Sequence, residues 1–354
     1  PVESSPEGWT AGKDLLSIKA LDVCDIELII DTATAFQEVS GRAIKKVPAL
    51  RGKTIANLFI EPSTRTQTSF ELAAKRLSAD VVNLSGTSSS IMKGESLVDT
   101  GRALESMGVD LVVIRHSAAG AAHTLARTLK AGVINAGDGR REHPTQALLD
   151  ALTIKKKFNS FKNLKIAICG DILHSRVARS NIEILLTLGA SINVIGPQTL
   201  IPKDLKKLGV NIYYDMKKGL KNCDIVMMLR IQKERIVGTH IPNEKEYFKK
   251  YGLDYKKLSF AKKKAFVMHP GPMNRGVEID SVVADSNQAI ILDQVLNGVA
   301  VRMSILYLLL GLILSLFAYT FIVDKSVNAN EMILEVSNKN PGYYIDIIKN
   351  TGHH

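Results

Sequence analysis

The strongest constraint on the fold is an alternation, repeated along most of the chain, of short apolar runs with segments of helical periodicity. The runs are almost continuously apolar, which is typical of parallel strands covered on both faces. Repeated strand–helix units of this kind indicate a doubly wound parallel sheet. We predict strands at residues 54–60, 80–84, 110–114, 133–136, 165–169, 191–195, 225–229 and 265–268. We predict helices at residues 66–77, 97–107, 122–129, 145–158 and 176–188.

The length of the chain favours two such sheets. Its 354 residues, 45% of them apolar, are enough for two domains of ordinary size, each with a packed core. The sequence KKKFNSFK at residues 155–162 interrupts the apolar pattern after a long predicted helix, so we place the boundary there. The predicted fold class is therefore α/β, with two doubly wound parallel-sheet domains. Because ligands bind such sheets at the carboxyl ends of the strands, the residues that follow each strand are the candidates for function.

Composition excludes several classes of protein. Three cysteines, Cys24, Cys169 and Cys223, form neither a disulfide framework nor a C-x-x-C pair, which fits the reducing cytosol. The eight histidines show no H-E-x-x-H spacing, so we expect no metal site. The net charge is +11, many lysines occur in doublets and triplets, and no aromatic residues interleave with the arginines. This pattern favours solvated lysines over a nucleic-acid surface.

The first predicted strand is followed by the sequence EPSTRT at residues 61–66, which starts the next helix. Free N–H groups in a first helical turn bind phosphate, and Ser and Thr are strong N-caps. Arg65 adds a planar fork of donors that matches phosphate oxygens. A capped helix with a surface arginine is the alternative, but the position directly after a buried strand favours an anion site. The loop at 86–95 carries Ser89 and Lys93 and either closes over an anion or is a flexible connection.

Three further residues of the first half have suitable chemistry. Arg115 follows the strand predicted at 110–114, and His143 stands immediately before Pro144, a natural first helical residue. Gln146 lies on the same first turn. A neutral imidazole and a carboxamide in this place can polarise a carbonyl and hold an amino group, although a lone His-Pro pair is usually only a helix start.

The second half repeats the arrangement. Arg176 and Arg230 each come shortly after a predicted strand, and guanidinium groups pair bidentately with carboxylates. The strand at 265–268 leads into the sequence HPGP at 269–272. Structural ion pairs are the alternative for the charged residues that follow Arg230.

Taken together, these motifs resemble the aspartate carbamoyltransferases, the catalytic chains of pyrimidine biosynthesis. The resemblance covers roughly residues 14–311, and eight motifs occur in the expected order. They are FIEPSTRTQTSFE, SSSIMKGES, VVIRHS, NAGDGRREHPTQALLD, GDILHSRVARS, LRIQKER, HPGPMNRGVEI and VLNGVAVRMSILYLLLG.

The resemblance implies transfer of the carbamoyl group from carbamoyl phosphate to L-aspartate, the committed step of pyrimidine synthesis, without a metal or organic cofactor. The implied carbamoyl-phosphate contacts are Ser63, Thr64, Arg65, Thr66, Ser89, Arg115, His143 and Gln146. The implied aspartate contacts are Lys93, Arg176, Arg230, Gln232, Pro270 and Gly271. The implied catalytic residues are Arg65, Thr66, Lys93, Arg115 and His143. In this family Ser89 and Lys93 reach in from a neighbouring subunit, which implies a homotrimer with shared active sites.

The resemblance also implies a division of the chain. We expect a flexible lead at 1–13 without a signal peptide, a carbamoyl-phosphate-binding domain at 14–153 and an aspartate-binding domain at 154–294. A C-terminal helix at 295–311 is expected to return to the first domain, and 312–354 is an appended tail of unknown role. The uncharged run from Met303 to Val323 is long enough to cross a bilayer, but its first part matches the returning helix. We therefore expect a cytoplasmic enzyme, with membrane anchoring as the minority hypothesis.

The sequence leaves two alternative functions. Ornithine carbamoyltransferases share the S-T-R-T and H-P-x-Q elements, but they carry H-C-L-P where this chain has HPGP. A non-catalytic homologue that scaffolds a partner enzyme usually loses some of the catalytic residues, and here they are intact. Association with a dihydroorotase or a regulatory chain is left open by the sequence.

Overall fold

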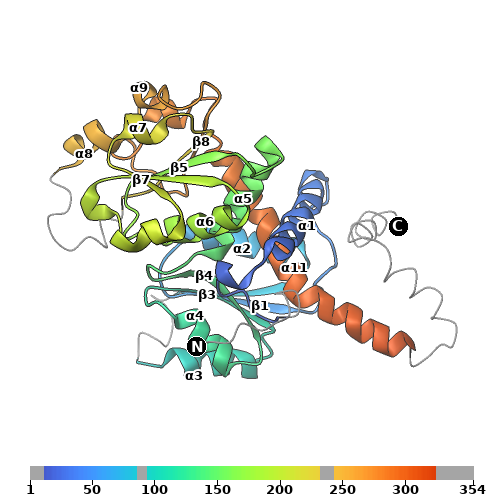
Figure 1. Cartoon of the computed structure of the whole chain (residues 1–354). Coiled ribbons are helices and arrows are strands. Elements are labelled where there is room, and N and C mark those ends of the chain that lie inside the picture. The colour runs from blue at the N-terminus through green and yellow to red at the C-terminus, as the bar shows by residue number, and fades with distance from the viewer. Residues whose placement is uncertain (1–11, 86–93, 232–242, 324–354) are drawn as a thin grey trace.

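The computed structural model describes residues 12–85, 94–231 and 243–323, with the backbone alone for Ser40 and for 312–323. Two parallel sheets, each with helices on both faces, form the body of the protein (Figure 1). The observed class is thus α/β with two doubly wound parallel sheets and a long C-terminal helix, as the sequence predicts.

The first sheet has the strand order β2-β1-β3-β4. Its strands are β1 (Thr54–Phe59), β2 (Asp80–Ser85), β3 (Leu111–His116) and β4 (Gly132–Asp138). Side chains of β1 alternate between two cores: Ile55 and Phe59 face one, and Ala56 and Leu58 face the other. The second core is closed by α3 (Leu97–Ser106) and α4 (Ala121–Thr128). The order of strands reverses direction between β1 and β3, which makes that gap the topological switch point of the sheet.

The second sheet has the strand order β7-β6-β5-β8-β9. Its strands are β5 (Lys165–Cys169), β6 (Ser191–Ile195), β7 (Asn211–Tyr213), β8 (Ile225–Met228) and β9 (Phe266–Met268). The switch point lies between β5 and β8. The helices of this half are α6 (Arg176–Thr187), α7 (Met216–Leu220), α8 (Glu244–Tyr251), α9 (Tyr255–Leu258) and α10 (Ser281–Ala284), with short 3-10 turns at Gln198–Leu200 and Lys203–Leu208.

Helices join the two halves into one body. The largest hydrophobic core runs without a break from α1 (Val23–Gly41) and α2 (Thr64–Arg76) through α5 (Pro144–Phe158) to α6. The C-terminal helix α11 (Ile291–Val323) begins beside β9 in the second half and packs on α1, α2 and α5 of the first. A 3-10 turn at Ile18–Ala20 leads into α1, where Asp22 and Asp25 form a capping box.

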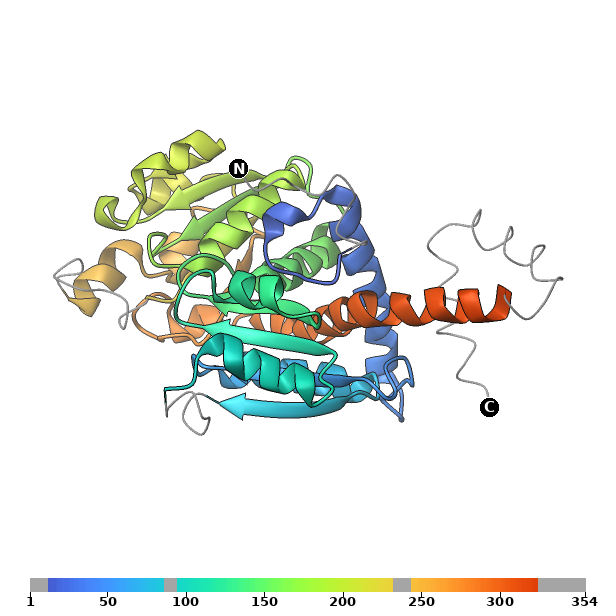
Figure 2. The same cartoon turned by 90° about the horizontal axis from the view of Figure 1, so that it is seen from below.

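One helix within the described residues, Ile291–Gly311, is apolar and long enough to span a membrane by length and composition, and 72% of that stretch is buried inside the protein. This burial is what a core helix shows. The backbone of α11 continues beyond Gly311 and extends away from the body in both views (Figures 1 and 2). The helix therefore covers the whole of the apolar run from Met303 to Val323.

Packing of α11 is expected to contribute to the stability of the fold. Leu306 is fully buried in the large core, whereas Leu292, on the same helix, is 81% exposed. We expect Leu306→Ala to lower the free energy of unfolding by about 2–5 kcal/mol, because it opens a cavity in a closely packed core. Leu292→Ala is the matched control and is expected to change it by no more than about 0.5 kcal/mol. Urea unfolding measures both, and equal effects of the two substitutions would contradict this account of the helix.

The predicted strands and the five helices predicted from periodicity are found within two residues of their expected ends, whereas the C-terminal helix, expected at 295–311, runs from Ile291 to Val323. No strand was predicted for β7, a short strand at the sheet edge, and no helix for α1, whose residues carry no strong amphipathic pattern, or for the short helices α7 to α10. The predicted lead and most of the predicted tail lie outside the described residues.

Candidate active site

A cavity of about 750 Å³ lies where the carboxyl ends of the two sheets meet. The loops after β1 and β3 enter it from the first sheet, and those after β5, β8 and β9 from the second. Both switch points therefore open into a single space, the position in which doubly wound sheets bind ligands. It is lined by Glu61, Ser63, Thr64, Arg65, Thr66, Arg115, His143, Gln146, Arg176, Arg230, Pro270, Gly271 and Arg302, among others.

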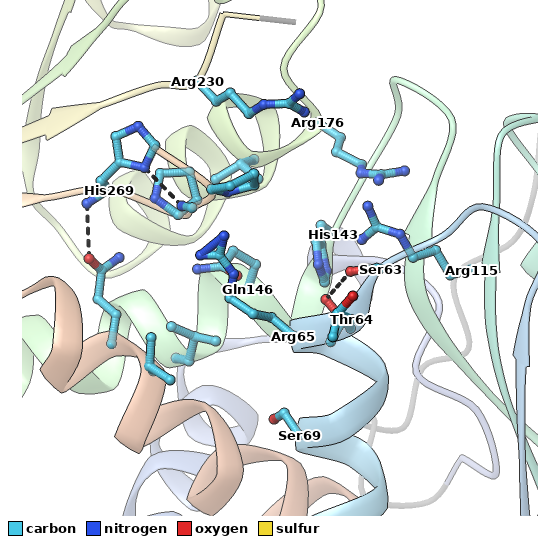
Figure 3. Close-up of a pocket in the computed structure, with 18 of the residues that line it drawn as sticks. Ser63, Thr64, Arg65, Ser69, Arg115, His143, Gln146, Arg176, Arg230 and His269 are labelled. Carbon is cyan, nitrogen blue, oxygen red and sulfur yellow. Dashed lines mark hydrogen bonds between the residues drawn. The ribbon is translucent and has the colours of Figure 1, made fainter. Parts of the chain in front are cut away.

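The first turn of α2 supplies donors for an anion. Ser63 occupies the N-cap in an extended conformation, and its hydroxyl donates to Thr66 Oγ1 at 3.0 Å instead of capping the helix backbone. The Ser63 side chain therefore leaves the backbone N–H groups of this first turn uncapped. These groups lie at the end of α2 that borders the cavity. Figure 3 shows Ser63 and Thr64 below His143 and Arg115.

Arg65 extends to the opposite side of the cavity, toward the loop that follows β9 (Figure 3). Its guanidinium lies so close to Gly271 that a Cβ at that position would clash with it, and Gly271 also has a φ of +68°. Burial and the neighbouring Arg230 lower the pKa of Arg65, which still leaves the group charged at neutral pH. Position 271 requires glycine because a Cβ would clash with Arg65 and because the backbone φ is positive.

Glu61 connects the two halves of the cavity. Its carboxylate pairs with Arg115 Nη2 at 2.8 Å and also with both terminal nitrogens of Arg176. Arg176 begins α6, and its guanidinium passes over Gly137, where a Cβ would lie 3.0 Å from Cζ. A side chain from the first sheet thereby holds arginines from both sheets at one place.

His143 is 4% exposed and stands at the start of α5, directly before Pro144. Its backbone N–H donates to Ser180 Oγ at 2.9 Å, and its buried Nδ1 has no partner among the described residues. Burial, followed by the charges of Arg115, Arg176 and Arg302, lowers the pKa of His143 well below its usual value. The imidazole is therefore neutral at physiological pH and is able to donate one hydrogen bond without carrying charge.

The depressed pKa of His143 predicts a pH effect on stability. The unfolded chain takes up this proton near pH 6.5, while the folded protein does not until much lower pH, so stability is lost as the pH falls below about 6.5. Between pH 7.5 and 5.5 we expect wild type to lose about 1 kcal/mol more free energy of unfolding than His143→Gln does. Urea unfolding at the two pH values measures the difference, and parallel pH profiles would count against a buried neutral imidazole.

The structure describes eleven of the residues that the sequence singles out, and all of them line the cavity: Ser63, Thr64, Arg65, Thr66, Arg115, His143, Gln146, Arg176, Arg230, Pro270 and Gly271. Ser89, Lys93 and Gln232 lie outside the described residues. Arg65, Arg115 and His143 of the first half therefore line the same cavity as Arg176 and Arg230 of the second.

Several further residues line the same cavity without having been predicted as site residues, among them Glu61, Ser69, Gln294 and Arg302. Arg302 is 4% exposed and donates from Nη1 to Ser69 Oγ at 2.9 Å, with its guanidinium 5.1 Å from the ring of Phe70. Burial lowers its pKa to about 10, so it remains charged. Glu61 stands inside the quoted EPSTRT motif, but Gln294 and Arg302 are on α11, and no local pattern connects them to the strand ends.

Fold and site together define a class: a two-sheet α/β protein with a cationic cleft, formed jointly by both halves, for small anionic ligands. Within the described residues, no three His, Cys, Asp or Glu side chains gather as a metal site would require.

The family model "Aspartate/ornithine carbamoyltransferase, carbamoyl-P binding domain" matches residues 13–156, and the "Asp/Orn binding domain" of the same family matches 162–309. The chain belongs to the aspartate/ornithine carbamoyltransferase family. It is 57% identical over 294 residues to an aspartate carbamoyltransferase catalytic subunit of Methylorubrum extorquens (strain PA1), covering 83% of this chain and 93% of the relative. The catalytic subunit of Moorella thermoacetica is 56% identical over 299 residues, covering 84% and 97%.

Solved structures agree with this relationship. An aspartate transcarbamoylase of Trypanosoma cruzi in complex with N-(phosphonacetyl)-L-aspartic acid superposes with a TM-score of 0.77 at 32% identity, covering 86% of this chain and 98% of that one. An ornithine carbamoyltransferase of Pyrococcus furiosus gives a TM-score of 0.75 at 29% identity, with coverage of 85% and 97%. The fold is therefore shared by both branches of the family, and the higher sequence identities are to aspartate enzymes.

Proposed function

We propose that this protein is an aspartate carbamoyltransferase, which converts carbamoyl phosphate and L-aspartate to N-carbamoyl-L-aspartate and phosphate, the committed step of pyrimidine synthesis. The observation that carries the proposal is the single cleft into which both switch points open, lined by arginines from each sheet. Such a cleft suits two small anions that must meet. Relatives named as aspartate carbamoyltransferases at 54–57% identity support aspartate, rather than ornithine, as the second substrate.

Carbamoyl phosphate is proposed to occupy the side formed by the first sheet. Ser63, Thr64 and Thr66 would hold the phosphate at the start of α2, where backbone N–H groups and the helix dipole favour negative charge. Arg65 would swing from Gly271 toward the phosphate when it binds. Gln146, on the first turn of α5, would accept a hydrogen bond from the carbamoyl amino group.

Aspartate is proposed to bind against the second sheet. The guanidinium groups of Arg176 and Arg230 would pair with its carboxylates, with Gln232 beside them. Backbone carbonyls of Pro270 and Gly271 would accept from its amino group, which places the nitrogen next to the carbamoyl carbon.

The chemistry then requires a neutral amine and a stabilised oxyanion. The aspartate nitrogen attacks the carbamoyl carbon, charge builds on the carbonyl oxygen, the C–O bond to phosphate breaks, and the departing phosphate accepts the proton that the attacking nitrogen loses. Arg115, neutral His143 and Thr66 would stabilise that oxygen, and Arg65 with Lys93 would stabilise the departing phosphate. Holding the two substrates in contact supplies much of the remaining rate.

A colorimetric assay for carbamoyl aspartate with purified protein tests the function. Product from aspartate, and little from ornithine supplied in parallel, is expected. Product from ornithine alone would favour the ornithine branch, and no product from either would favour a non-catalytic homologue.

We further propose a homotrimer in which Ser89 and Lys93 of one subunit complete the site of the next. Mixing inactive Lys93→Ala and His143→Ala proteins under conditions that exchange subunits should then restore part of the activity, because some sites receive both intact residues. Mixing each variant with itself is the control. Absence of recovery in exchanged trimers would oppose shared sites.

The remaining assignments are also proposals. Residues 14–153 with 295–311 would form the carbamoyl-phosphate-binding domain and 154–294 the aspartate-binding domain, which agrees with the helix α11 packing on α1, α2 and α5. The burial of Ile291–Gly311 supports a cytoplasmic enzyme over a membrane-anchored one. Recovery of the full chain in a detergent-free supernatant is the expected result.

A further inference from the structure

A fully buried carboxylate, Asp150, contacts two residues that line the cavity, Gln146 and Gln294, and has no part in the mechanism above. It is one helical turn after Gln146 on α5, so the two side chains lie on the same face of that helix. Gln146 Nε2 donates to Asp150 Oδ1 at 3.0 Å. Two more carboxamides converge on the same group: Gln294 Nε2 donates to Oδ1 at 2.7 Å, and Asn181 Nδ2 to Oδ2 at 2.8 Å.

These contacts fix the orientation of the amides. An ionised carboxylate only accepts hydrogen bonds, so each amide must turn its nitrogen toward Asp150 and its oxygen away. Burial raises the pKa of Asp150 to about 6, while the three amides and Arg302 oppose the rise, and the group is therefore ionised at pH 7.5. Gln146 lines the cavity, and its oxygen is the atom left to meet a ligand.

Gln294 extends the same network to the second half of the site. With its nitrogen held by Asp150, its Oε1 accepts from the backbone N–H of His269 at 2.9 Å (Figure 3). His269 in turn accepts at Nδ1 from the N–H of Gly271 at 2.8 Å. The Asp150 carboxylate thus orients the side chain of Gln146 in the first half. Through Gln294 it also supports the loop after β9 in the second half.

We propose that Asp150 is a positioning residue: its carboxylate fixes the carboxamide of Gln146 so that the oxygen accepts from the amino group of the bound carbamoyl ligand, and through Gln294 it holds the loop that begins at His269. This inference rests on the proposed function, because it assigns the amino group of carbamoyl phosphate to Gln146. A purely structural role, as a tie between α5, α6 and α11, is the competing explanation.

Acetyl phosphate separates the two explanations, since it has a methyl group where carbamoyl phosphate has the amino group. The neutral amide in Asp150→Asn presents a donor as readily as an acceptor, so Gln146 loses its single orientation. We expect affinity for carbamoyl phosphate, measured by calorimetry at pH 7.5, to fall about tenfold, with acetyl phosphate changed by no more than about twofold. Gln146→Ala should give the same selective loss, and the double variant should add little to it.

Thr153→Val is the matched control. Thr153 is also fully buried on α5 and accepts from Asn297 of α11 at 2.8 Å, so this variant disturbs a similar contact between the same helices. It should leave the ratio of the two affinities unchanged. Equal losses of both ligands in Asp150→Asn, or no loss of either, would reject the positioning role.

The swapped pair Asp150→Asn with Asn181→Asp provides a second test, and the one that decides if Asp150→Asn alone does not fold. The carboxylate introduced at position 181 would accept from the amide nitrogen introduced at position 150, which turns the oxygen of that amide back toward Gln146 and Gln294. We expect the wild-type preference for carbamoyl phosphate to return, and a folded swap without that preference would reject the proposal. Wild type that makes no carbamoyl aspartate would instead reject the proposed function, so the two failures are distinguishable.

Discussion

Replacing Arg115 by alanine is expected to reduce kcat by about 10² to 10³-fold, the usual effect of removing one donor that stabilises a developing oxyanion. The residue lies one position before the end of β3, beside the switch point of the first sheet, and its side chain is only 13% exposed. Its charge also acts on His143, whose pKa it helps to lower. Loss of the guanidinium therefore removes a hydrogen-bond donor. It also removes one of the positive charges that keep the His143 imidazole neutral.

Steady-state rates at saturating concentrations of both substrates measure this effect. Arg127→Ala is the control, since Arg127 is an exposed arginine on α4 outside the cavity, and its kcat should stay within about twofold of wild type. Arg115→Lys should recover only part of the rate, because an ammonium does not reproduce the planar fork. A loss below tenfold in Arg115→Ala would contradict the role assigned to this residue.

Arg176→Ala is expected to lower kcat/KM for aspartate by about 10² to 10³-fold while carbamoyl phosphate binds nearly as in wild type. A charge-assisted pair with a carboxylate contributes roughly 1.5–3 kcal/mol, or about 10 to 150-fold. Arg176 also pairs with Glu61, so its removal breaks the link between the two halves of the cavity and adds to the loss.

The control for this change lies on the same helix. Arg179 is exposed on α6, and its guanidinium donates to the carbonyl of Leu173 at 3.4 Å. Arg179→Ala should leave both substrates unaffected in kinetics and in calorimetric binding. If Arg176→Ala weakened carbamoyl phosphate as strongly as aspartate, the assignment of this arginine to the second substrate would be wrong.

Residues adjacent to strand ends were readily predicted from the sequence. Ser63 to Thr66, Arg115 and Arg230 each follow a continuous apolar run, and the carboxyl ends of parallel strands collect at one edge of a sheet. His143 was located by the proline after it, since proline is favoured at the first position of a helix. Their roles come from the family resemblance and stay predictions.

The sequence by itself determined two parallel sheets, the order of their elements and a set of cationic residues at their carboxyl edges, because apolar runs and helix starts are local patterns. Only the tertiary structure decided that Glu61 pairs with arginines of both sheets, and that Gln294 meets Asp150, 144 residues away in the chain. The Glu61 contacts depend on how the two sheets meet at the cavity, and the Gln294 contact depends on how α11 packs on α5. Long-range packing of this kind leaves no periodicity or spacing from which to predict a hydrogen-bond partner.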